Sequence, residues 1–315
     1  MSFLQSMLVA LLARPAALQG QTDALARDYT EACRLDSLGK HATAIVILDR
    51  LEADPAWRYK AVMRRGSARF ALKEPMKALE DLTLATRLEP DSMAPYLNRG
   101  SMYLELGMPE RSLADIEEGL RRCRSAKDSA SALMNKGATL THVRRFEEAL
   151  RAYDHSLVLR PEDAATLMNK ASVLDDLGRE AEAREILLGL HAATPDDVYV
   201  INNLGFHASN RDDHAEALRW FEKALVLRPD DPIVLNNLSY AQLRTGAVDK
   251  ALQNAQRSIK LYPANSYAHR NLGLIWLEKG EKDKACAALE EALRRGFTEM
   301  YGPEAETLRR TRCAP

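Results

Sequence analysis

Six asparagines recur at nearly regular spacing in segments that otherwise have the composition of helices. They are Asn98, Asn135, Asn169, Asn203, Asn237 and Asn271, so the first interval is 37 residues and the next four are 34 residues each. Asparagine is unfavourable inside a helix, because its amide competes with the backbone for hydrogen bonds. A primary amide offers donors and an acceptor, so it can pair with a peptide unit whatever that peptide's side chains are. These residues, the asparagine ladder, are candidates for binding a polypeptide backbone; alternatively, their amides bond between neighbouring segments and serve the fold.

Prolines and small residues follow the same period. Four prolines stand 34 residues apart: Pro161, Pro195, Pro229 and Pro263. A second series consists of small residues: Gly66, Gly100, Gly137, Ala171, Gly205, Ser239 and Gly273. A fixed period of this length indicates a repeat array. Proline cannot continue a helix, and small residues let two helices approach closely, so each repeat is expected to be a pair of antiparallel helices.

One period, "INNLGFHASNRDDHAEALRWFEKALVLRPDD" at 201–231, resembles a tetratricopeptide repeat. The family pattern of large, small, alanine, aromatic, small and proline positions is met by Ile201, Gly205, Ala217, Phe221, Ala224 and Pro229. The resemblance implies an all-α fold, an α-solenoid in which antiparallel helix pairs stack into a right-handed superhelix. In this frame eight repeats occupy 25–299, with the bounds 25–58, 59–92, 93–129, 130–163, 164–197, 198–231, 232–265 and 266–299.

The segments outside this pattern carry separate predictions. Residues 1–24 form an N-terminal segment that we expect to be helical, and residues 300–315 resemble the ending of some bacterial members of the family. That ending is expected to form a capping helix over the last apolar face, because the terminal repeats of a solenoid need a cover. The third repeat has three extra residues within 121–129 and marks an expected irregularity between two sub-arrays.

The resemblance also implies where a ligand would bind. In the family, the first helix of each repeat lines the concave groove, and the asparagine ladder falls on its sixth position. The tetratricopeptide domain of O-linked N-acetylglucosamine transferase is similar, and its ladder holds an extended polypeptide by the backbone. Aromatic, amide and arginine side chains at neighbouring groove positions are further candidates: Tyr199, Asn202, Phe206, Asn236, Tyr240, Tyr267 and Arg270. Aromatic residues and arginine are typical interface anchors; the alternative is that the rings fill the groove and pack on one another.

Lys60 and Arg64 stand one helical turn apart in a basic stretch that has no acidic residue. At groove positions, this pair resembles part of the carboxylate clamp of chaperone-binding members of the family. Thr30 stands where that clamp needs asparagine, which speaks against a chaperone site. A solvated basic surface is the alternative, and a site for an acidic part of a partner is the hypothesis that salt dependence would test.

No catalytic motif is recognisable: the sequence lacks a P-loop, HExxH, GxSxG and a dinucleotide fingerprint. We therefore predict no enzyme activity, catalytic residue, metal or cofactor. The favoured function is an interaction scaffold that binds an extended peptide of a protein partner; the alternative is an accessory subunit of an enzyme, secretion or envelope complex that docks a folded partner. A net charge of −1 gives no reason to expect nucleic acid. A monomer is favoured.

The apolar N-terminal run and the cysteines bear on location. The run from Phe3 to Ala13 is too short to span a membrane and lacks a preceding basic residue. The four cysteines (Cys33, Cys123, Cys286 and Cys313) have no metal-binding spacing. Reduced thiols and a cytoplasmic location are expected; an apolar N-terminus acting as an export signal would instead place the protein in the periplasm. Cys286 and Cys313 could pair if the C-terminal tail folds back.

Overall fold

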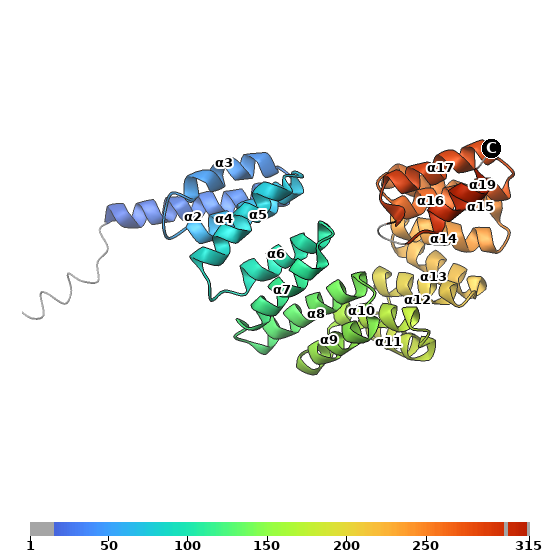
Figure 1. Cartoon of the computed structure of the whole chain (residues 1–315), viewed down its shortest axis with the longest axis horizontal. Coiled ribbons are helices and arrows are strands. Elements are labelled where there is room, and N and C mark those ends of the chain that lie inside the picture. Colours follow the sequence, from blue (N-terminus) through green and yellow to red (C-terminus); the bar gives the residue numbers. More distant parts are fainter. Residues whose placement is uncertain (1–15, 299–301, 314–315) are drawn as a thin grey trace, which may run out of the picture. The chain divides into compact units, whose positions relative to one another are not determined.

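The chain is built from α-helices joined by short turns (Figure 1). The computed structural model describes residues 16–298 and 302–313, and within these residues it has 17 helices and no strand. The all-α prediction is therefore confirmed. A helix begins at Ala16, and the first fifteen residues of the N-terminal segment 1–24, for which helix was predicted, lie outside the described part. No described helix is long and apolar enough to cross a membrane.

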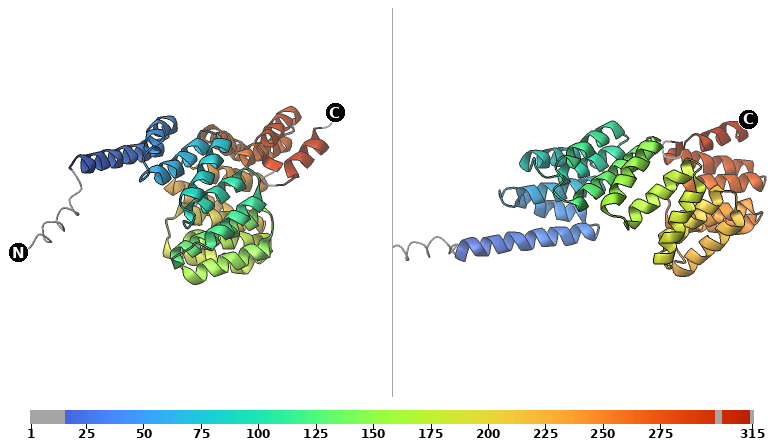
Figure 2. Two further views of the ribbon diagram at one scale, coloured as in Figure 1. Left: turned by 60° about the vertical axis from the view of Figure 1, so that its left-hand side comes forward. Right: turned by 90° about the horizontal axis from the view of Figure 1, so that it is seen from below.

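The helices divide into two compact units, residues 1–161 and residues 162–315. The first unit contains α2 (Ala16–Ser37), α3 (His41–Leu51), α4 (Arg58–Ala71), α5 (Pro75–Leu88), α6 (Ala94–Glu105), α7 (Pro109–Leu120), α8 (Ala126–His142) and α9 (Phe146–Leu159). The second contains α10 (Ala164–Asp176), α11 (Glu180–Ala193), α12 (Val198–Asn210), α13 (His214–Leu227), α14 (Pro232–Arg244), α15 (Val248–Leu261), α16 (Ser266–Glu278), α17 (Lys282–Arg294) and α19 (Glu304–Arg312). Within each unit the hairpins stack on their neighbours in chain order (Figure 2).

Eight consecutive hairpins, α2/α3 to α16/α17, are each closed by a turn of three residues. In every one of these turns the middle residue has a positive φ. Glycine takes that place in five of them, whereas Lys73, Arg144 and Asp212, with φ of 63°, 60° and 57°, take it in the others. Left-handed backbone is costly for a residue with a Cβ. The hairpin geometry is thus conserved along the chain even where the residue at the turn opposes it.

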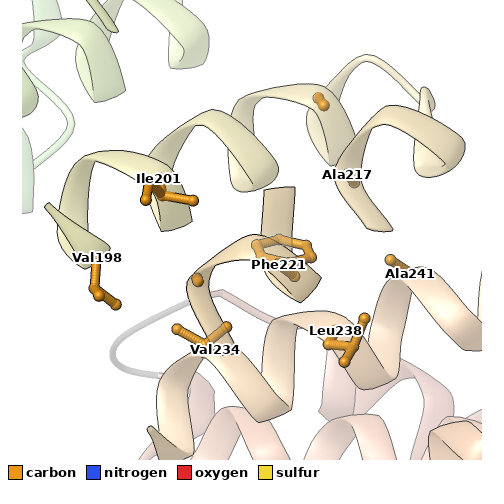
Figure 3. Packing of buried hydrophobic residues seen from close by; sticks show 9 residues of the cluster. Val198, Ile201, Ala217, Phe221, Val234, Leu238 and Ala241 are labelled. Carbon is orange, nitrogen blue, oxygen red and sulfur yellow. The ribbon is translucent and has the colours of Figure 1, made fainter. Parts of the chain in front are cut away.

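The two helices of a hairpin approach each other at a small residue, and Figure 3 shows the buried side chains that pack around one such contact. Phe221 of α13 is fully buried and packs among Val198, Ile201, Val234 and Leu238. A Cβ added at Gly205 of α12 would stand 2.5 Å from Cε1 of the Phe221 ring, which is closer than two carbon atoms can lie. The periodic small residue therefore makes room for the large side chain that fills the hairpin.

The irregular third repeat forms a longer connection and a longer helix. Residues 121–125 separate α7 from α8, and α8 has 17 residues where most of the first helices have 12–14. Ser125 caps α8, because its Oγ accepts a hydrogen bond from the Asp128 backbone N–H at 3.1 Å. The prediction that this segment separates two sub-arrays is wrong, since the division between the two units falls after Pro161.

The last helix, α19, covers the end of the second unit. Ala305 of α19 is fully buried against Leu289 and Ala292 of α17 and against Phe297. A disulfide between Cys286 of α17 and Cys313, the residue after α19, joins the two helices, with the Cα atoms 5.6 Å apart. The expectation that all four cysteines are reduced is wrong for this pair; Cys33 and Cys123 are free thiols.

Replacement of glycine by alanine should have opposite effects at Gly178, which lies in a positive-φ turn, and at Gly189, which lies inside α11. A Cβ would meet nothing within 4 Å at either Gly178 or Gly189, so only the backbone conformation differs. Gly178→Ala forces alanine to adopt a φ of 72° and should lower the free energy of unfolding by about 1 kcal/mol. Gly189→Ala, inside α11, should raise it by about 1 kcal/mol through helix propensity. Urea denaturation of both variants measures the two changes in the free energy of unfolding. Equal changes would contradict the different backbone conformations of the two glycines.

Candidate functional site

The first helices of the hairpins in the second unit form one continuous face. Helices α10, α12, α14 and α16 each contact the next in this series, so their side chains line a shared surface. One residue of the asparagine ladder lies on each helix: Asn169, Asn203, Asn237 and Asn271. The other two predicted ladder residues, Asn98 and Asn135, lie in the first unit on α6 and α8.

Several amides of this face bond to one another across neighbouring repeats. Nδ2 of Asn271 donates to Oδ1 of Asn236 at 2.8 Å, and Nδ2 of Asn236 donates to Oδ1 of Asn237 at 3.2 Å. Nδ2 of Asn237 donates in turn to Oδ1 of Asn202 at 3.0 Å. Asn271 is 0% exposed and Asn236 is 2% exposed, so these two side chains lie inside the repeat interface. Their amides join α12, α14 and α16, which is the structural alternative that the sequence left open.

The other ladder residues differ from this buried pair. Asn203 and Asn169 are half-buried, and their side chains make no hydrogen bond within the part of the chain that the structure describes. In the first unit the same holds for Asn135, which is half-buried, and for Asn98, which is exposed. The asparagine ladder is therefore heterogeneous: some amides are used by the fold, and others keep both donor and acceptor available.

Two adjoining pockets open on the face of the second unit. The first, the amide pocket, has a volume of about 290 Å³, and its lining is Ser172, Asn202, Asn203, Phe206, Ile233, Asn236, Asn237, Asn265 and Tyr267. The second, the aromatic pocket, has a volume of about 230 Å³, and its lining is Phe206, Ser209, Asn210, Asp212, Phe221, Asn237, Tyr240 and Tyr267. Because both share Phe206, Asn237 and Tyr267, the two pockets are continuous. Amide groups thus stand beside aromatic rings over three successive repeats.

A third and larger pocket, the terminal pocket, has a volume of about 750 Å³ and includes Tyr240, Arg244, Arg270, Glu304 and Arg312 in its lining. Arg270 is only 5% exposed. Its Nη1 donates to Oδ1 of Asn271 at 2.7 Å, and its Nη2 is paired with the carboxylate of Glu304 on α19. The guanidinium carbon lies 5.2 Å from the centre of the Tyr240 ring and 5.3 Å from that of Tyr267, so two tyrosines flank the cation.

The four predicted aromatic anchors have different surroundings. Phe206 is 39% exposed and lines both the amide and the aromatic pocket. Tyr267 is half-buried and packs on Phe297, with ring centres 5.8 Å apart, so it also serves the C-terminal core. Tyr199 is 59% exposed, lies under the guanidinium of Arg228, and is absent from the lining of the three pockets. Three of the four rings are therefore brought together with the amides.

The basic stretch of the first unit is largely balanced by acidic neighbours. Lys60 is exposed, with its Nζ 5.0 Å from the centre of the Trp57 ring. Arg64 Nη1 lies 3.4 Å from Asp36 Oδ2, and its hydrogen bond with Cys33 raises the pKa of the guanidinium. The structure brings neither side chain together with another predicted site residue except through their shared helix, α4.

Arg65, between these residues in the sequence, is buried at 6% exposure and is part of the fold. Its Nη2 lies 2.7 Å from Asp81 Oδ1, and its Nη1 is paired with Asp49 and Glu52. Burial opposes the charged form of the guanidinium, but these hydrogen bonds outweigh it and raise the pKa of Arg65. Arg65 is therefore not available to an acidic partner.

The Arg65–Asp81 pair has a counterpart one repeat later that the sequence could have revealed. Arg99 Nε lies 2.7 Å from Asp115 Oδ2, and both pairs join the two helices of a hairpin across 16 residues of sequence. Arginine and aspartate thus recur at the 34-residue period in two repeats. They are a structural ion pair, because both partners of each pair are largely buried. Within the described residues, no group of three histidine, cysteine, aspartate or glutamate side chains could hold a metal ion.

Removing Asp81 or Asp49, two of the three carboxylate partners of Arg65, should lower the free energy of unfolding by different amounts. Asp81→Ala leaves a buried guanidinium without its best-buried partner and should lower the free energy of unfolding by about 3 kcal/mol. Asp49→Ala removes a carboxylate that is 49% exposed and should lower it by less than about 1 kcal/mol. Chemical denaturation of the two variants at pH 7 gives the comparison; similar losses would argue against the structural role of the buried pair.

Comparison with known proteins matches this arrangement to one family. A family model described as tetratricopeptide repeat matches residues 143–198, 204–266 and 236–296. Among solved structures, a tetratricopeptide repeat protein from Parabacteroides merdae superposes with a TM-score of 0.67 at 18% identity, covering 81% of this chain and 99% of its own. Yeast Tom70 gives a TM-score of 0.66 at 16% identity, over 87% of this chain and 58% of its own. At such identities these structures support the fold.

A sequence relative covers less of the chain. The chicken (Gallus gallus) protein DnaJ homolog subfamily C member 3 is 26% identical over 151 residues, which is 45% of this chain and 30% of the relative. The chain thus spans less than a third of that relative's length.

Proposed function

Because the chain belongs to the tetratricopeptide repeat family, we propose that it is a non-enzymatic protein–protein interaction scaffold that binds an extended peptide. The binding face is that of α10, α12, α14 and α16. The observation that carries this proposal is the amide pocket, where asparagine side chains from successive helices stand beside aromatic and aliphatic side chains. This combination suits a polypeptide, whose backbone needs hydrogen bonds and whose side chains need apolar contacts.

The amides would hold the backbone of the peptide. The side chain of Asn203 has no partner within the described residues, so it can donate to a carbonyl and accept from an amide N–H. Asn202 uses its Oδ1 to accept from Asn237, and its Nδ2 donates to no acceptor in the part of the chain that the structure describes. Contacts to the peptide unit do not distinguish side chains, so this part of the groove would accept many sequences.

The apolar side chains beside the amides would give the groove a preference for apolar residues in the ligand. Phe206 is 39% exposed and Ile233 is 43% exposed, and both line the amide pocket. Large apolar side chains that remain exposed in a pocket bury their surface when a ligand binds, which contributes about 25 cal/mol for each Å² removed from water. An extended segment with one bulky apolar residue fits this lining. The alternative function is docking of a folded partner. The pocket lining does not favour it, because apolar side chains inside a pocket are buried by a segment that enters the pocket.

The two kinds of ladder residue provide a matched test. Asn203→Ala and Phe206→Ala should each weaken binding of peptides selected from a random twelve-residue library by about tenfold, or about 1.4 kcal/mol, because each removes a contact to the ligand. Both should leave the melting temperature nearly unchanged, since neither side chain is buried in the core. Titration calorimetry and thermal melts on the same preparations measure the two quantities.

Asn271→Ala is the control, because Asn271 is 0% exposed and bonds to Asn236 and Arg270. It should lower the free energy of unfolding by about 2 kcal/mol by leaving buried partners unpaired. If Asn203→Ala and Phe206→Ala behaved in the same way, with loss of stability and unaltered affinity, the groove residues would serve the fold and the proposed function would be rejected.

The disulfide supports the second of the two predicted locations. Disulfides persist in oxidising compartments and are rare in the cytosol, and the Cys286–Cys313 pair would be maintained in the periplasm. Acid quenching of cells followed by alkylation with a mass-tagged maleimide should label Cys33 and Cys123 only, out of the four cysteines. Labelling of all four thiols would favour the cytoplasm.

A further inference from the structure

The terminal pocket contains a buried cation whose carboxylate partner comes from the covering helix. Asn202, Asn236, Arg270 and Glu304 are successive residues at the 34-residue period, on α12, α14, α16 and α19. In that register α19 continues the face of the groove by one more helix. Glu304 therefore stands beside Arg270 at the position where a further repeat would present a groove residue.

The two members of this ion pair are buried to very different degrees. The Arg270 side chain is 6% exposed, whereas that of Glu304 is 51% exposed. A buried guanidinium requires an anionic partner, because its desolvation is otherwise uncompensated. A half-exposed carboxylate loses little when water replaces its contacts. The pair therefore has a fixed cation and an anion that another carboxylate in solution can replace.

Three features mark the cation as part of a binding site. Its Nε has no hydrogen-bond partner within the described residues, although the atom is buried. Two tyrosine rings flank it, which orients the planar fork. The pocket of about 750 Å³ beside it has three arginines in its lining, Arg270, Arg244 and Arg312, against two carboxylates, Glu278 and Glu304. A planar, pre-oriented guanidinium matches the two oxygens of a carboxylate.

The terminal pocket also connects with the groove described above. Tyr240 lines both the aromatic and the terminal pocket. Arg270 donates to Asn271, and Asn271 donates to Asn236, which lines the amide pocket. Because each pocket shares lining residues with the next, an extended peptide held at the amide pocket would continue through the aromatic pocket into the terminal pocket.

From this arrangement we propose that the terminal pocket is a carboxylate subsite of the peptide groove, and that Glu304 occupies it in the free protein. The ligand chemistry is one carboxylate of the bound segment, from an acidic side chain or from a chain end, that replaces Glu304 beside Arg270. The proposal rests on the proposed function for the identity of the ligand as a peptide. In the free protein Glu304 would lower the affinity for acidic segments, because its carboxylate must leave Arg270 before the carboxylate of the ligand can bind there.

The test uses the full chain with its disulfide intact and three small probes. N-acetylglutamate α-methylamide carries only a side-chain carboxylate, N-acetylglycine carries only a terminal carboxylate, and N-acetylglutamine α-methylamide is neutral. Each is titrated into ¹⁵N-arginine-labelled protein while the Nε–Hε resonance of Arg270 is followed; Arg270→Lys identifies that resonance by its loss. The variants are Glu304→Gln and the matched control Glu306→Gln, which removes one exposed carboxylate from the same helix.

We expect one or both carboxylate probes to bind Glu304→Gln about tenfold more tightly than the wild type or Glu306→Gln, with no response to the neutral probe. The carboxylate probe that responds identifies the source, side chain or chain end. Glu304→Ser should bind the carboxylate probes as tightly as Glu304→Gln does. Agreement between the two variants shows that the effect comes from loss of the Glu304 carboxylate and not from misfolding of one variant. Equal affinity in the wild type and both Glu304 variants, or an equal response to the neutral probe, would overturn the subsite. This titration does not depend on Asn203 or Phe206. A negative result here would therefore reject the carboxylate subsite alone, whereas the proposed function is tested by the Asn203 and Phe206 variants.

Discussion

The close approach of two helices within each hairpin is the constraint on which the rest of the structure depends. At Gly205 the absence of a side chain allows the Phe221 ring to enter between α12 and α13. The same ring then packs against Val234 and Leu238 of α14, so one buried side chain joins a hairpin to its successor. Because no hairpin can bury this face alone, each depends on its neighbour, and α19 supplies the apolar surface that packs on the hairpin of α16 and α17.

Stacking of the hairpins determines which side chains of the first helices meet one another. Each of α12, α14 and α16 presents residues of the same register to the next, so like side chains meet like side chains. Amides can bond to one another without loss of pairing, since each has both donors and an acceptor. The bonds from Asn271 to Asn236 and from Asn237 to Asn202 show this self-association. Other amides, such as that of Asn203, take no part in this self-association and make no hydrogen bond within the described residues.

Much of this architecture could be predicted from the sequence, because periodic residues report local geometry directly. Proline and glycine at 34-residue intervals give the helix ends and close contacts, and so predict the hairpins. The left-handed turns at Lys73 and Arg144 could not be predicted in this way, since lysine and arginine disfavour the conformation, whereas the aspartate at Asp212 tolerates it better. The hairpin imposes it through the contacts of the helices on either side.

The sequence predicted that the ladder residues lie on equivalent helices, but it did not predict their different surroundings. The spacing placed Asn203 and Asn271 at equivalent places, yet one is half-buried without a partner and the other is fully buried. Asn271 accepts a hydrogen bond from Arg270 and donates one to Asn236, whereas Asn203 has no such partner within the described residues, and the 34-residue period does not encode this difference. The acidic partners that bury Arg65 come from α3 and α5, and the recurrence of arginine and aspartate 34 residues later is the one signal of this role in the sequence.

The disulfide also changes how mechanical force would travel through the protein. Tension applied to the chain beyond Cys313 passes through the sulfur atoms to Cys286, in the middle of α17, and bypasses α19. Helix α19 therefore cannot be peeled from the end of the array one turn at a time. The load is instead delivered to a helix whose residues Ala285, Leu289 and Ala292 are fully buried, so the last hairpin and its cover would yield as one mechanical element.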